Sequence, residues 1–365
     1  MSKLEELINE LCPNGVEYKT LNHICVVETG SQLNKDKMLE TGLYPVMNGG
    51  ISPSGYWNEY NTEANTITIS QGGASAGYVN YITSPFWAGA HCYIVKLITD
   101  QVIYKFLYYF LKNQEYILLN SKKGAGIPGL NKKEIYSLAI PLPPLPVQQE
   151  IVRILDKFTE LTAELTAELT ARKKQYEYYR DLLLTFDDDD AVEWKRIEEI
   201  TNSISSGKNK DKREDGLYPV YGSTGIIGKT DNFVYEKQQI LVARVGANAG
   251  YVHIADGRYD VSDNTLIIDV KDGYALRYVY YQLCNINLNR LAKGGGQPLI
   301  TASQLKDIQI PVPPLEEQER IVAILDRFEA LCNDLTIGLP AEIEAREKQF
   351  KYYLNKLLDF KEATS

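Results

Sequence analysis

The stretch IPLPPLPVQQEIVRILDKF, at Ile140–Phe158, returns later in the chain as IPVPPLEEQERIVAILDRF, at Ile310–Phe328. In both copies a pair of prolines follows a short apolar segment, and apolar residues three and four positions apart begin directly after it. Prolines break regular structure, and the three-and-four spacing is typical of an amphipathic helix. Each copy therefore predicts an extended break followed by a long helix, and the recurrence predicts a duplicated unit.

The repeat extends to both sides of this junction. RKKQYEYYRDLLLTF at Arg172–Phe186 returns as REKQFKYYLNKLLDF at Arg346–Phe360, and GASAGYV at Gly73–Val79 returns as GANAGYV at Gly246–Val252. Three shorter segments also recur. VEYK at 16–19 returns as VEWK at 192–195, NKDK occurs at 34–37 and 209–212, and GLYPV occurs at 42–46 and 216–220. Because the matches keep their order, we interpret the chain as one unit duplicated with small insertions.

Each unit begins with a globular part. Short β-branched runs such as NTITIS (Asn65–Ser70) and QQILVARV (Gln238–Val245) alternate with glycine-rich turns, which favours irregular, strand-rich α+β domains. The run from Val102 to Leu119 predicts a helix within the first of them.

The first long helix is expected to run from about Val147 to Phe186, which at 1.5 Å per residue is roughly 60 Å. The second is expected from about Glu316, with an interruption at Gly338 and Pro340 before it resumes. The spacing in the first helix resembles a coiled-coil seam. Its expected seam residues are Ile151, Leu155, Phe158, Thr162, Leu165, Leu169, Tyr176, Tyr179 and Leu183.

Chain connectivity predicts the direction of this pairing. Only DDDDA, at residues 187–191, separates the first helix from the second globular part, so the second helix can pack on the first cheaply only by running antiparallel. The expected fold is α+β, with two related domains held apart by two long antiparallel helices and an internal pseudo-twofold axis. The expected divisions are residues 1–146, 147–190, 191–315 and 316–365.

The charge is distributed unevenly along the chain. The formal net charge is −9, but residues 147–190 and 316–365 carry all of it, and the two globular parts are balanced. Local basic surfaces in the globular parts can therefore still bind phosphate.

Other features narrow the class of protein. No apolar run is long enough for a membrane span, and five scattered cysteines without a CxxC pair indicate reduced thiols, so a cytoplasmic location is expected. The three histidines, at 23, 91 and 253, lack the spacing of metal ligands, and we interpret His253 as structural. Neither a metal nor a cofactor is expected.

A pseudo-twofold molecule with two different heads suits the dyad symmetry of duplex DNA, with one half-site for each head. Several motifs also resemble a known family. PLPPLPVQQEIV, the TAELTAELTAR run, KKQYEYYRDLLLTF and LPAEIEAREKQFKYYLNKLL are similar to the helical regions of type I restriction–modification specificity subunits, and ELCPNGVEYKTL is similar to their opening.

The resemblance covers nearly the whole chain. It implies two target-recognition domains, at residues 1–146 and 191–315, joined by spacer helices. It also implies binding to double-stranded DNA and to two modification subunits that methylate adenine, with ATP-driven restriction subunits joining them. The specificity subunit itself would then be non-catalytic. Some type II systems use a similar subunit with a fused methyltransferase–nuclease partner, and that alternative stays open.

The DNA contacts cannot be carried over by motif, because the heads differ. We look instead for basic or amide side chains that recur in glycine-rich loops, with solvated surface as the alternative for each. Gln71 and Arg244 match in position, and suit adenine and guanine or phosphate respectively. The full set of candidates is Lys35, Lys37, Gln71, Lys122, Lys123, Lys208, Lys210, Lys212, Arg213, Arg244 and Lys293.

Tyrosines gather near the ends of both long helices and cannot all face one partner. Packing in the seam and contact with modification subunits are both open for them. These candidates are Tyr176, Tyr178, Tyr179, Tyr352 and Tyr353.

The sequence argues against two other classes of protein, a nucleotide-using enzyme and a structural scaffold. STGIIGKT, at Ser223–Thr230, is one residue short of a phosphate-binding loop, but a strand-like segment follows where a helix is required. The glycine-rich GAGIPG and GGGQP do not open a Rossmann unit, so a methyl-donor site is not expected. A purely structural coiled-coil scaffold leaves two large duplicated heads unexplained.

Overall fold

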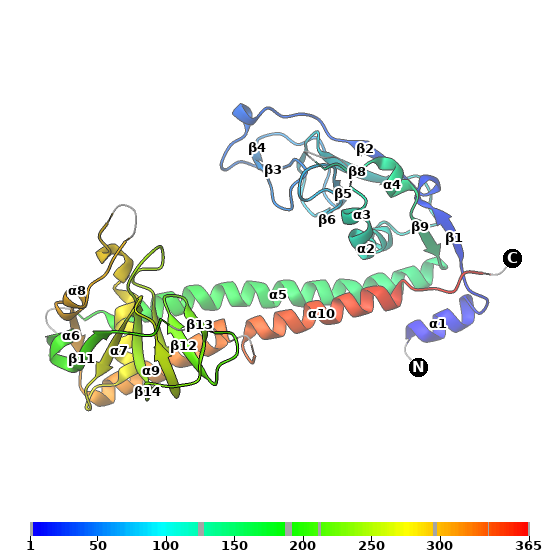
Figure 1. The fold of residues 1–365 in the computed structure, drawn as a ribbon. Helices are drawn as coiled ribbons and strands as arrows, with labels where there is room; N and C mark the ends of the chain where they lie inside the picture. The colour runs from blue at the N-terminus through cyan, green and yellow to red at the C-terminus, as the bar shows by residue number, and fades with distance from the viewer. Residues whose placement is uncertain are drawn as a thin grey trace. The chain divides into compact units, whose positions relative to one another are not determined.

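The computed structural model describes residues 3–122, 128–186, 192–210, 213–294, 298–334 and 336–363. It divides into unit 1, Met1–Thr166 with Glu342–Ser365, and unit 2, Ala167–Ala341 (Figure 1). The long helix α5 (Leu145–Leu184) contributes its first part to unit 1 and its second part to unit 2.

Unit 1 contains a four-stranded antiparallel sheet and a smaller three-stranded sheet. The larger sheet has the order β2-β8-β5-β6, and in the smaller one β3 lies between β4 and β7. Alternating β-branched residues explain β5, where TITIS places Ile67 and Ile69 in the core. The elements are α1 (Lys3–Leu11), β1 (Glu17–Thr20), η1 (Leu21–His23), β2 (Cys25–Thr29), η2 (Lys35–Lys37), β3 (Tyr44–Met47), β4 (Gly55–Trp57), β5 (Thr66–Ser70), β6 (Val79–Ile82), β7 (Trp87–Ala88), β8 (Cys92–Leu97), α2 (Tyr104–Asn113), α3 (Glu115–Asn120), α4 (Lys132–Tyr136) and β9 (Ala139–Leu142).

Unit 2 repeats this plan. Its sheets have the orders β11-β18-β15-β16 and β13-β12-β17-β14, and the parallel pair β12–β17 corresponds to the parallel pair β3–β7. The α+β class and the duplicated domain are thus confirmed. The elements are β10 (Glu193–Arg196), α6 (Ile197–Ile200), β11 (Thr201–Ser206), β12 (Tyr218–Gly222), β13 (Gly225–Thr230), β14 (Tyr235–Glu236), β15 (Gln239–Ala243), β16 (Val252–Ala255), β17 (Arg258–Val261), β18 (Thr265–Val270), α7 (Leu276–Asn285), η3 (Leu288–Leu291), α8 (Ala302–Lys306), β19 (Gln309–Val312), α9 (Leu315–Asn333) and α10 (Leu339–Leu357), the last lying mostly in unit 1.

The long helices begin where the proline pairs predict. The expected start at Val147 becomes Leu145 in α5, and the expected start at Glu316 becomes Leu315 in α9. The interruption of the second helix is also confirmed, but Pro340 does not cause it. Pro340 lies in the first turn of α10, where a helix tolerates a missing N–H, and the break precedes it. The expected helix from Val102 to Leu119 is divided at Gln114 into α2 and α3.

Seam contacts occur within each unit. In unit 1 the Phe158 ring stacks on that of Tyr353, with the centroids 5.2 Å apart, and α10 runs beside the first part of α5 (Figure 1). In unit 2 the Tyr179 ring stacks on that of Phe328 at 5.7 Å, so the second part of α5 pairs with α9. The later residue on α5 thus contacts the earlier residue of the C-terminal helices, which is the order expected of antiparallel helices.

A buried glutamine locks each proline break to its domain. The Gln148 amide donates to the carbonyls of Gln101 (2.9 Å) and Pro143 (2.8 Å), and its Oε1 accepts from the N–H of Ile103 (2.9 Å). Gln318 repeats this in unit 2: it donates to the Pro313 carbonyl (2.8 Å) and accepts from the Ala275 N–H (3.0 Å). One side chain thus satisfies backbone groups on both sides of the junction.

Replacing Gln148 with leucine is expected to lower the free energy of unfolding by about 1–3 kcal/mol, because three backbone groups at the proline break lose their hydrogen bonds to the Gln148 amide. Urea denaturation measures this loss. The matched control is Gln149→Leu, since Gln149 is exposed on the same helical turn. Equal stability of the two variants would contradict a structural role for the Gln148 amide.

Residues near the two ends of the sequence meet in unit 1. The Val16 N–H donates to the Lys361 carbonyl (2.9 Å), and the Ala363 N–H donates to the Val16 carbonyl (2.9 Å). The hydroxyl of Tyr18 also donates to the Phe360 carbonyl (2.8 Å). A segment that follows α10 therefore completes the packing of β1. No helix among the described residues is long and apolar enough to cross a membrane.

Candidate nucleic-acid interface

Gln71 and Arg244 occupy the same backbone position in the two domains. The Gln71 N–H donates to the His91 carbonyl (2.9 Å), as the Arg244 N–H donates to the Asn264 carbonyl (2.9 Å). Each then accepts at its own carbonyl, from Leu130 (2.8 Å) in one domain and from Ile300 (2.9 Å) in the other. The two loops therefore present different side chains from one common main-chain frame.

Arg244 is held in this frame with few partners. It is half-buried, and within the described part of the chain its Nε has no hydrogen-bond partner and its Nη1 donates to the Ser206 hydroxyl alone, at 3.4 Å. Among the residues that the structure describes, no carboxylate forms an ion pair with it. A half-buried guanidinium without a counter-charge favours an external acceptor such as guanine or phosphate.

Other unpaired polar atoms lie at the same end of the sheet β11-β18-β15-β16. Thr265 pairs with Ala243, the residue before Arg244, and its hydroxyl has no partner among the described residues. The Ser262 hydroxyl and the Asn209 Oδ1 are also buried and have no partner in that part of the chain. Buried polar groups are nearly always hydrogen-bonded. The unpaired atoms at this end of the sheet therefore favour a place where a polar ligand binds.

Gln71 is better satisfied within its own domain. Burial raises the pKa of the neighbouring Tyr93, and a hydrogen bond with the Gln71 side chain opposes this shift. The Tyr93 hydroxyl itself donates to the Leu130 carbonyl at 2.9 Å. The adjacent Ser70 hydroxyl is also paired, with the Gly49 carbonyl. The first domain therefore satisfies the polar groups around Gln71, whereas the second leaves several of those around Arg244 without partners among the described residues.

The other basic candidates, eight lysines and Arg213, fall into three groups. Lys35, Lys37, Lys208 and Lys210 are exposed, the first two on η2. Lys122 donates to the Ala74 carbonyl at 3.1 Å, Lys293 lies in a β-bridge with Leu299, and Arg213 forms an ion pair with Asp231. Lys123 and Lys212 lie outside the described residues. The exposed pairs remain candidates for phosphate contact, whereas the guanidinium of Arg213 already has an internal carboxylate.

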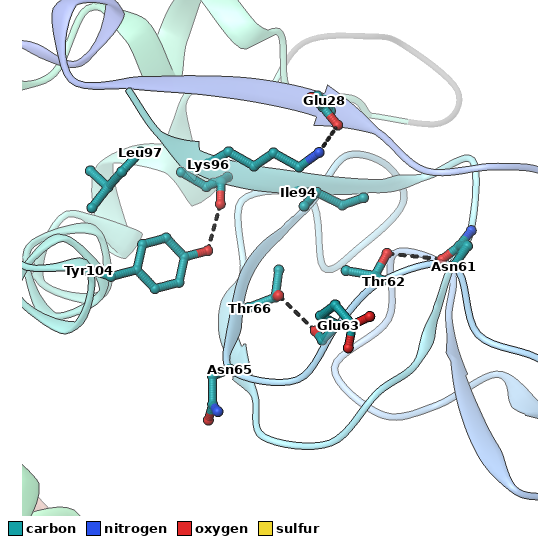
Figure 2. A pocket seen from close by; sticks show the side chains of 11 residues that line it. Glu28, Asn61, Thr62, Glu63, Asn65, Thr66, Ile94, Lys96, Leu97 and Tyr104 are labelled. Carbon is teal, nitrogen blue, oxygen red and sulfur yellow. Dashed lines mark hydrogen bonds and ion pairs between the residues drawn. The ribbon is translucent and has the colours of Figure 1, made fainter. Parts of the chain in front are cut away.

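A cleft of about 430 Å³ in the first domain is less suited to DNA. It is lined by residues that include Glu28, Glu63 and Lys96 (Figure 2). The Lys96 ammonium lies 2.6 Å from the Glu28 carboxylate, which neutralises its charge. Because Glu63 remains, the cleft repels phosphate rather than attracting it.

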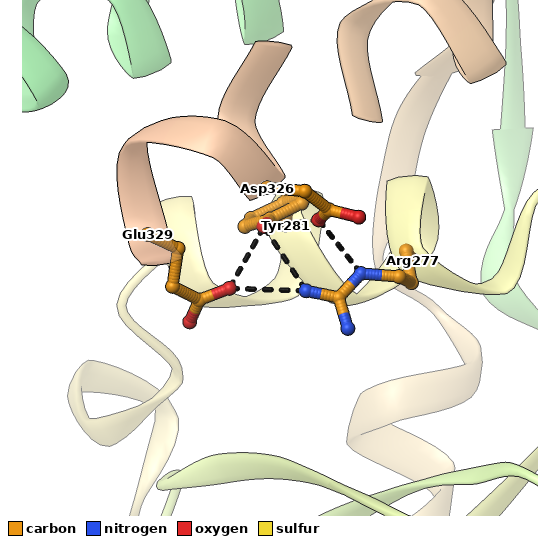
Figure 3. Close-up of polar contacts among 4 residues, drawn as sticks. All are labelled: Arg277, Tyr281, Asp326 and Glu329. Atoms are coloured by element: carbon orange, nitrogen blue, oxygen red, sulfur yellow. Dashed lines mark hydrogen bonds and ion pairs between the residues drawn. The ribbon is translucent and has the colours of Figure 1, made fainter. Parts of the chain in front are cut away.

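A polar cluster that sequence reasoning missed joins the second domain to its long helix. Arg277 on α7 donates to Asp326 (2.7 Å) and Glu329 (3.0 Å) on α9, and Tyr281 contacts both carboxylates (Figure 3). Burial and the neighbouring carboxylates raise the pKa of Tyr281, so it stays protonated as a donor.

The first domain has a shorter version of this cluster. The Lys105 ammonium and the Tyr109 hydroxyl both donate to Asp156 on α5, at 2.7 and 2.5 Å. These three residues align with Arg277, Tyr281 and Asp326 in the two copies of the repeat. The basic residue four positions before a tyrosine, and the aspartate that recurs in ILDKF and ILDRF, were the signal by which the sequence could have shown the cluster.

The tyrosines separate into two sets. Tyr176 and Tyr179 pack on Phe328, and Tyr353 packs on Phe158, so these three belong to the seam. Tyr178 and Tyr352 are 64% and 58% exposed. Because the latter two occupy equivalent repeat positions, they stay candidates for partner binding.

Two of the remaining sequence features have structural roles, whereas GAGIPG and GGGQP lie largely outside the described residues. Gly225–Thr230, the core of STGIIGKT, forms strand β13, so it opens no helix that could receive phosphate. His253 lies between the rings of Tyr221 and Tyr251, and burial lowers its pKa to about 4. Within the described residues no three His, Cys, Asp or Glu side chains gather in a way that could hold a metal ion.

Comparison with known proteins gives a consistent result. The family model for the type I restriction modification DNA specificity domain matches twice, at residues 13–172 and 190–345. The type I restriction enzyme EcoR124I/EcoR124II specificity subunit of Escherichia coli is 32% identical over 404 residues, which covers 99% of this chain and 97% of that protein.

Two solved structures share the fold. The S subunit of a type I restriction–modification system from M. genitalium covers 94% of this chain and 96% of its own, with a TM-score of 0.71 and 20% identity. A chain from a study of complex assembly and conformational transition of the type I R-M system has a TM-score of 0.56 at 18% identity, over 95% and 98% of the two chains. The duplicated domain, the paired helices and the double match of the family model lead to one conclusion: the chain belongs to the family of type I restriction–modification specificity subunits.

Proposed function

We propose that the first domain reads one half-site of an asymmetric DNA target, that the second domain reads the other, and that the long helices set the number of unread base pairs between them. The observation that carries this proposal is the common frame that presents Gln71 in one domain and Arg244 in the other. A frame used twice with different side chains suits two half-sites of different sequence.

The methyltransferase and nuclease chemistry would then belong to partners. Two modification subunits are expected, because a duplicated chain would offer each of them a related docking surface. Five free cysteines, four of them buried, support a reducing compartment such as the cytoplasm. A fused methyltransferase–nuclease partner, as in some type II systems, is the second candidate, since the same repeat would serve it.

The test is to express the chain with its modification subunits and to map methylated adenines across a genome. A two-part, asymmetric motif with a fixed gap is expected from the complex. The chain alone is expected to transfer no methyl group from S-adenosylmethionine. Methylation by the isolated chain, or a motif with a single continuous block, would overturn the assignment.

We further propose that Tyr178 and Tyr352 contact the modification subunits. Exposed aromatic residues are enriched at interfaces, and these two recur at equivalent positions on the two helices. Replacing both with alanine is expected to weaken assembly by tenfold or more, since buried interface tyrosines are frequent hot spots. Analytical ultracentrifugation measures this. Lys174→Ala, an exposed change on the same helix, is the control and should assemble normally.

A further inference from the structure

The two domains differ at one edge of the main sheet. β6 and β16 are the edge strands, and Val79 and Val252 take the same place in them, opposite Ile69 and Val242. The next backbone hydrogen bond of each ladder goes to the residue just before the valine. The Ser70 N–H donates to the Tyr78 carbonyl (2.9 Å), and the Ala243 N–H donates to the Tyr251 carbonyl (2.8 Å). Pairs of this kind are not hydrogen-bonded to each other, so both valines direct their N–H and C=O away from the sheet.

The first domain satisfies these outward groups with its own side chains. Glu115 accepts from the Val79 N–H at 2.8 Å, and the Lys112 ammonium donates to the Val79 carbonyl at 3.0 Å. The two side chains also pair with each other at 2.6 Å, and the ammonium lies 4.2 Å from the centre of the Tyr78 ring. The edge is therefore filled by an acceptor and a donor placed side by side.

The second domain lacks both members of this pair. Lys112 is the ninth residue of α2, and the ninth residue of α7 is Cys284. The segment that follows, from Asn285 to Asn287, has no charged residue. Among the described residues, no side chain is hydrogen-bonded to the main chain of Val252. A cleft of about 450 Å³ lies there instead, lined by residues 247–252, Tyr280, Cys284 and residues 287–289.

The lining of this cleft is aromatic, polar and uncharged. Tyr251 is 54% exposed beside it, and Tyr280 forms part of its wall. Burial raises the pKa of the Cys284 thiol to about 11, which keeps it neutral. A single charged group would therefore enter without a compensating charge, whereas a flat, uncharged ligand enters at lower cost.

We propose that the cleft binds a nucleobase, with an acceptor on the edge of the base receiving the Val252 N–H, a neighbouring donor reaching the Val252 carbonyl, and the face of the base stacked on tyrosine. Every base carries a donor and an acceptor side by side on one edge, and each has a π-face for stacking. The volume lies within the range of small-ligand pockets.

The base can come from DNA or from a free nucleoside. A base from DNA would rest on the proposed function, in which DNA contacts Arg244. Arg244 and Tyr251 belong to the same loop, so DNA bound at Arg244 would pass near the cleft. An unstacked base of the duplex is then the ligand. Binding of a free nucleoside does not depend on DNA recognition. Nucleoside binding can therefore be tested even if the proposed DNA-reading function is wrong, and the two failures can be told apart.

The test transplants the filling pair. The double variant Cys284→Lys with Asn287→Glu is expected to close the cleft and to weaken binding of adenosine to the full-length chain by at least about tenfold in calorimetry. Cys284→Ser keeps the cleft open and should bind like the parent chain. A target duplex with 2-aminopurine at successive positions tests the DNA source, since unstacking brightens the probe. A rise in the parent that is lost in the double variant identifies DNA as the source, and adenosine binding without that rise identifies a free nucleoside.

Tyr251→Ala guards against misfolding of the double variant. Tyr251 is largely exposed, so the fold should survive, while loss of stacking should weaken binding by about tenfold. The proposal is overturned if neither probe responds, or if both variants bind like the parent. It is also overturned if hydrogen exchange of residues 244–255 slows only when modification subunits are added, since a protein side chain would then be the occupant.

Discussion

Deleting one TAEL unit, Thr162–Leu165, is expected to move the two methylated half-sites closer by one or two base pairs and to leave both half-site sequences unchanged. α5 runs without a break from Leu145 to Leu184, so the deletion shortens it by about 6 Å and rotates the following residues by only about 40°. DNA rises about 3.4 Å per base pair, and twist absorbs part of the change. Leucines remain four residues apart, so the helix survives.

Duplicating the same unit should move the half-sites apart by a similar amount. Thr166→Ala, which keeps the length of the helix, should leave the spacing of the parent. The measurement is a genome-wide map of methylated adenines for each variant. If a folded deletion variant kept the original gap, α5 would not set the distance between the half-sites.

Replacing Arg244 with glutamine, the residue that the first domain has at this place, is expected to change the base preferred at one position of the second half-site. A bidentate contact contributes roughly 1–3 kcal/mol of discrimination, which is about tenfold to a hundredfold. The first half-site should stay the same. A randomised library of second half-sites, methylated by the complex and sequenced, gives the preference directly.

Arg258→Gln is the matched control in the same domain, because the Arg258 guanidinium is paired with Glu236 at 2.7 Å. The reciprocal variant Gln71→Arg should alter only the first half-site. An unchanged preference in both Arg244→Gln and Gln71→Arg would show that the common frame does not read sequence.

The sequence predicted those parts of the fold that are governed by local spacing. Proline pairs followed by apolar residues at helical intervals located the starts of α5 and α9 to within two residues. The recurrence of GASAGYV as GANAGYV predicted that Gln71 and Arg244 are equivalent, and their shared hydrogen bonds confirm it. Such patterns depend on residues that are close together in the chain.

Features that depend on distant partners were not predictable in this way. Arg213 stands in a basic cluster of the sequence, but Asp231, on the far side of a hairpin, pairs with it. The cleft beside Val252 exists because a lysine and a glutamate of the first domain have no counterparts in the second, and only the structure shows what those two residues do. The cluster of Arg277, Tyr281, Asp326 and Glu329 likewise joins residues about fifty positions apart.

The contact of Val16 with Lys361 and Ala363 has a consequence for biosynthesis. Residues 167–341 leave the ribosome before the segment that completes unit 1, which at about 5–20 residues per second takes about 10–35 s. Throughout that delay Leu354 and Leu358 are missing from the core of unit 1, and the outward backbone groups of Val16 face water. The second domain can therefore finish folding first, although it is translated later. A stop codon introduced before codon 342 would release a chain whose first domain exposes apolar surface, which marks it for chaperones and proteases.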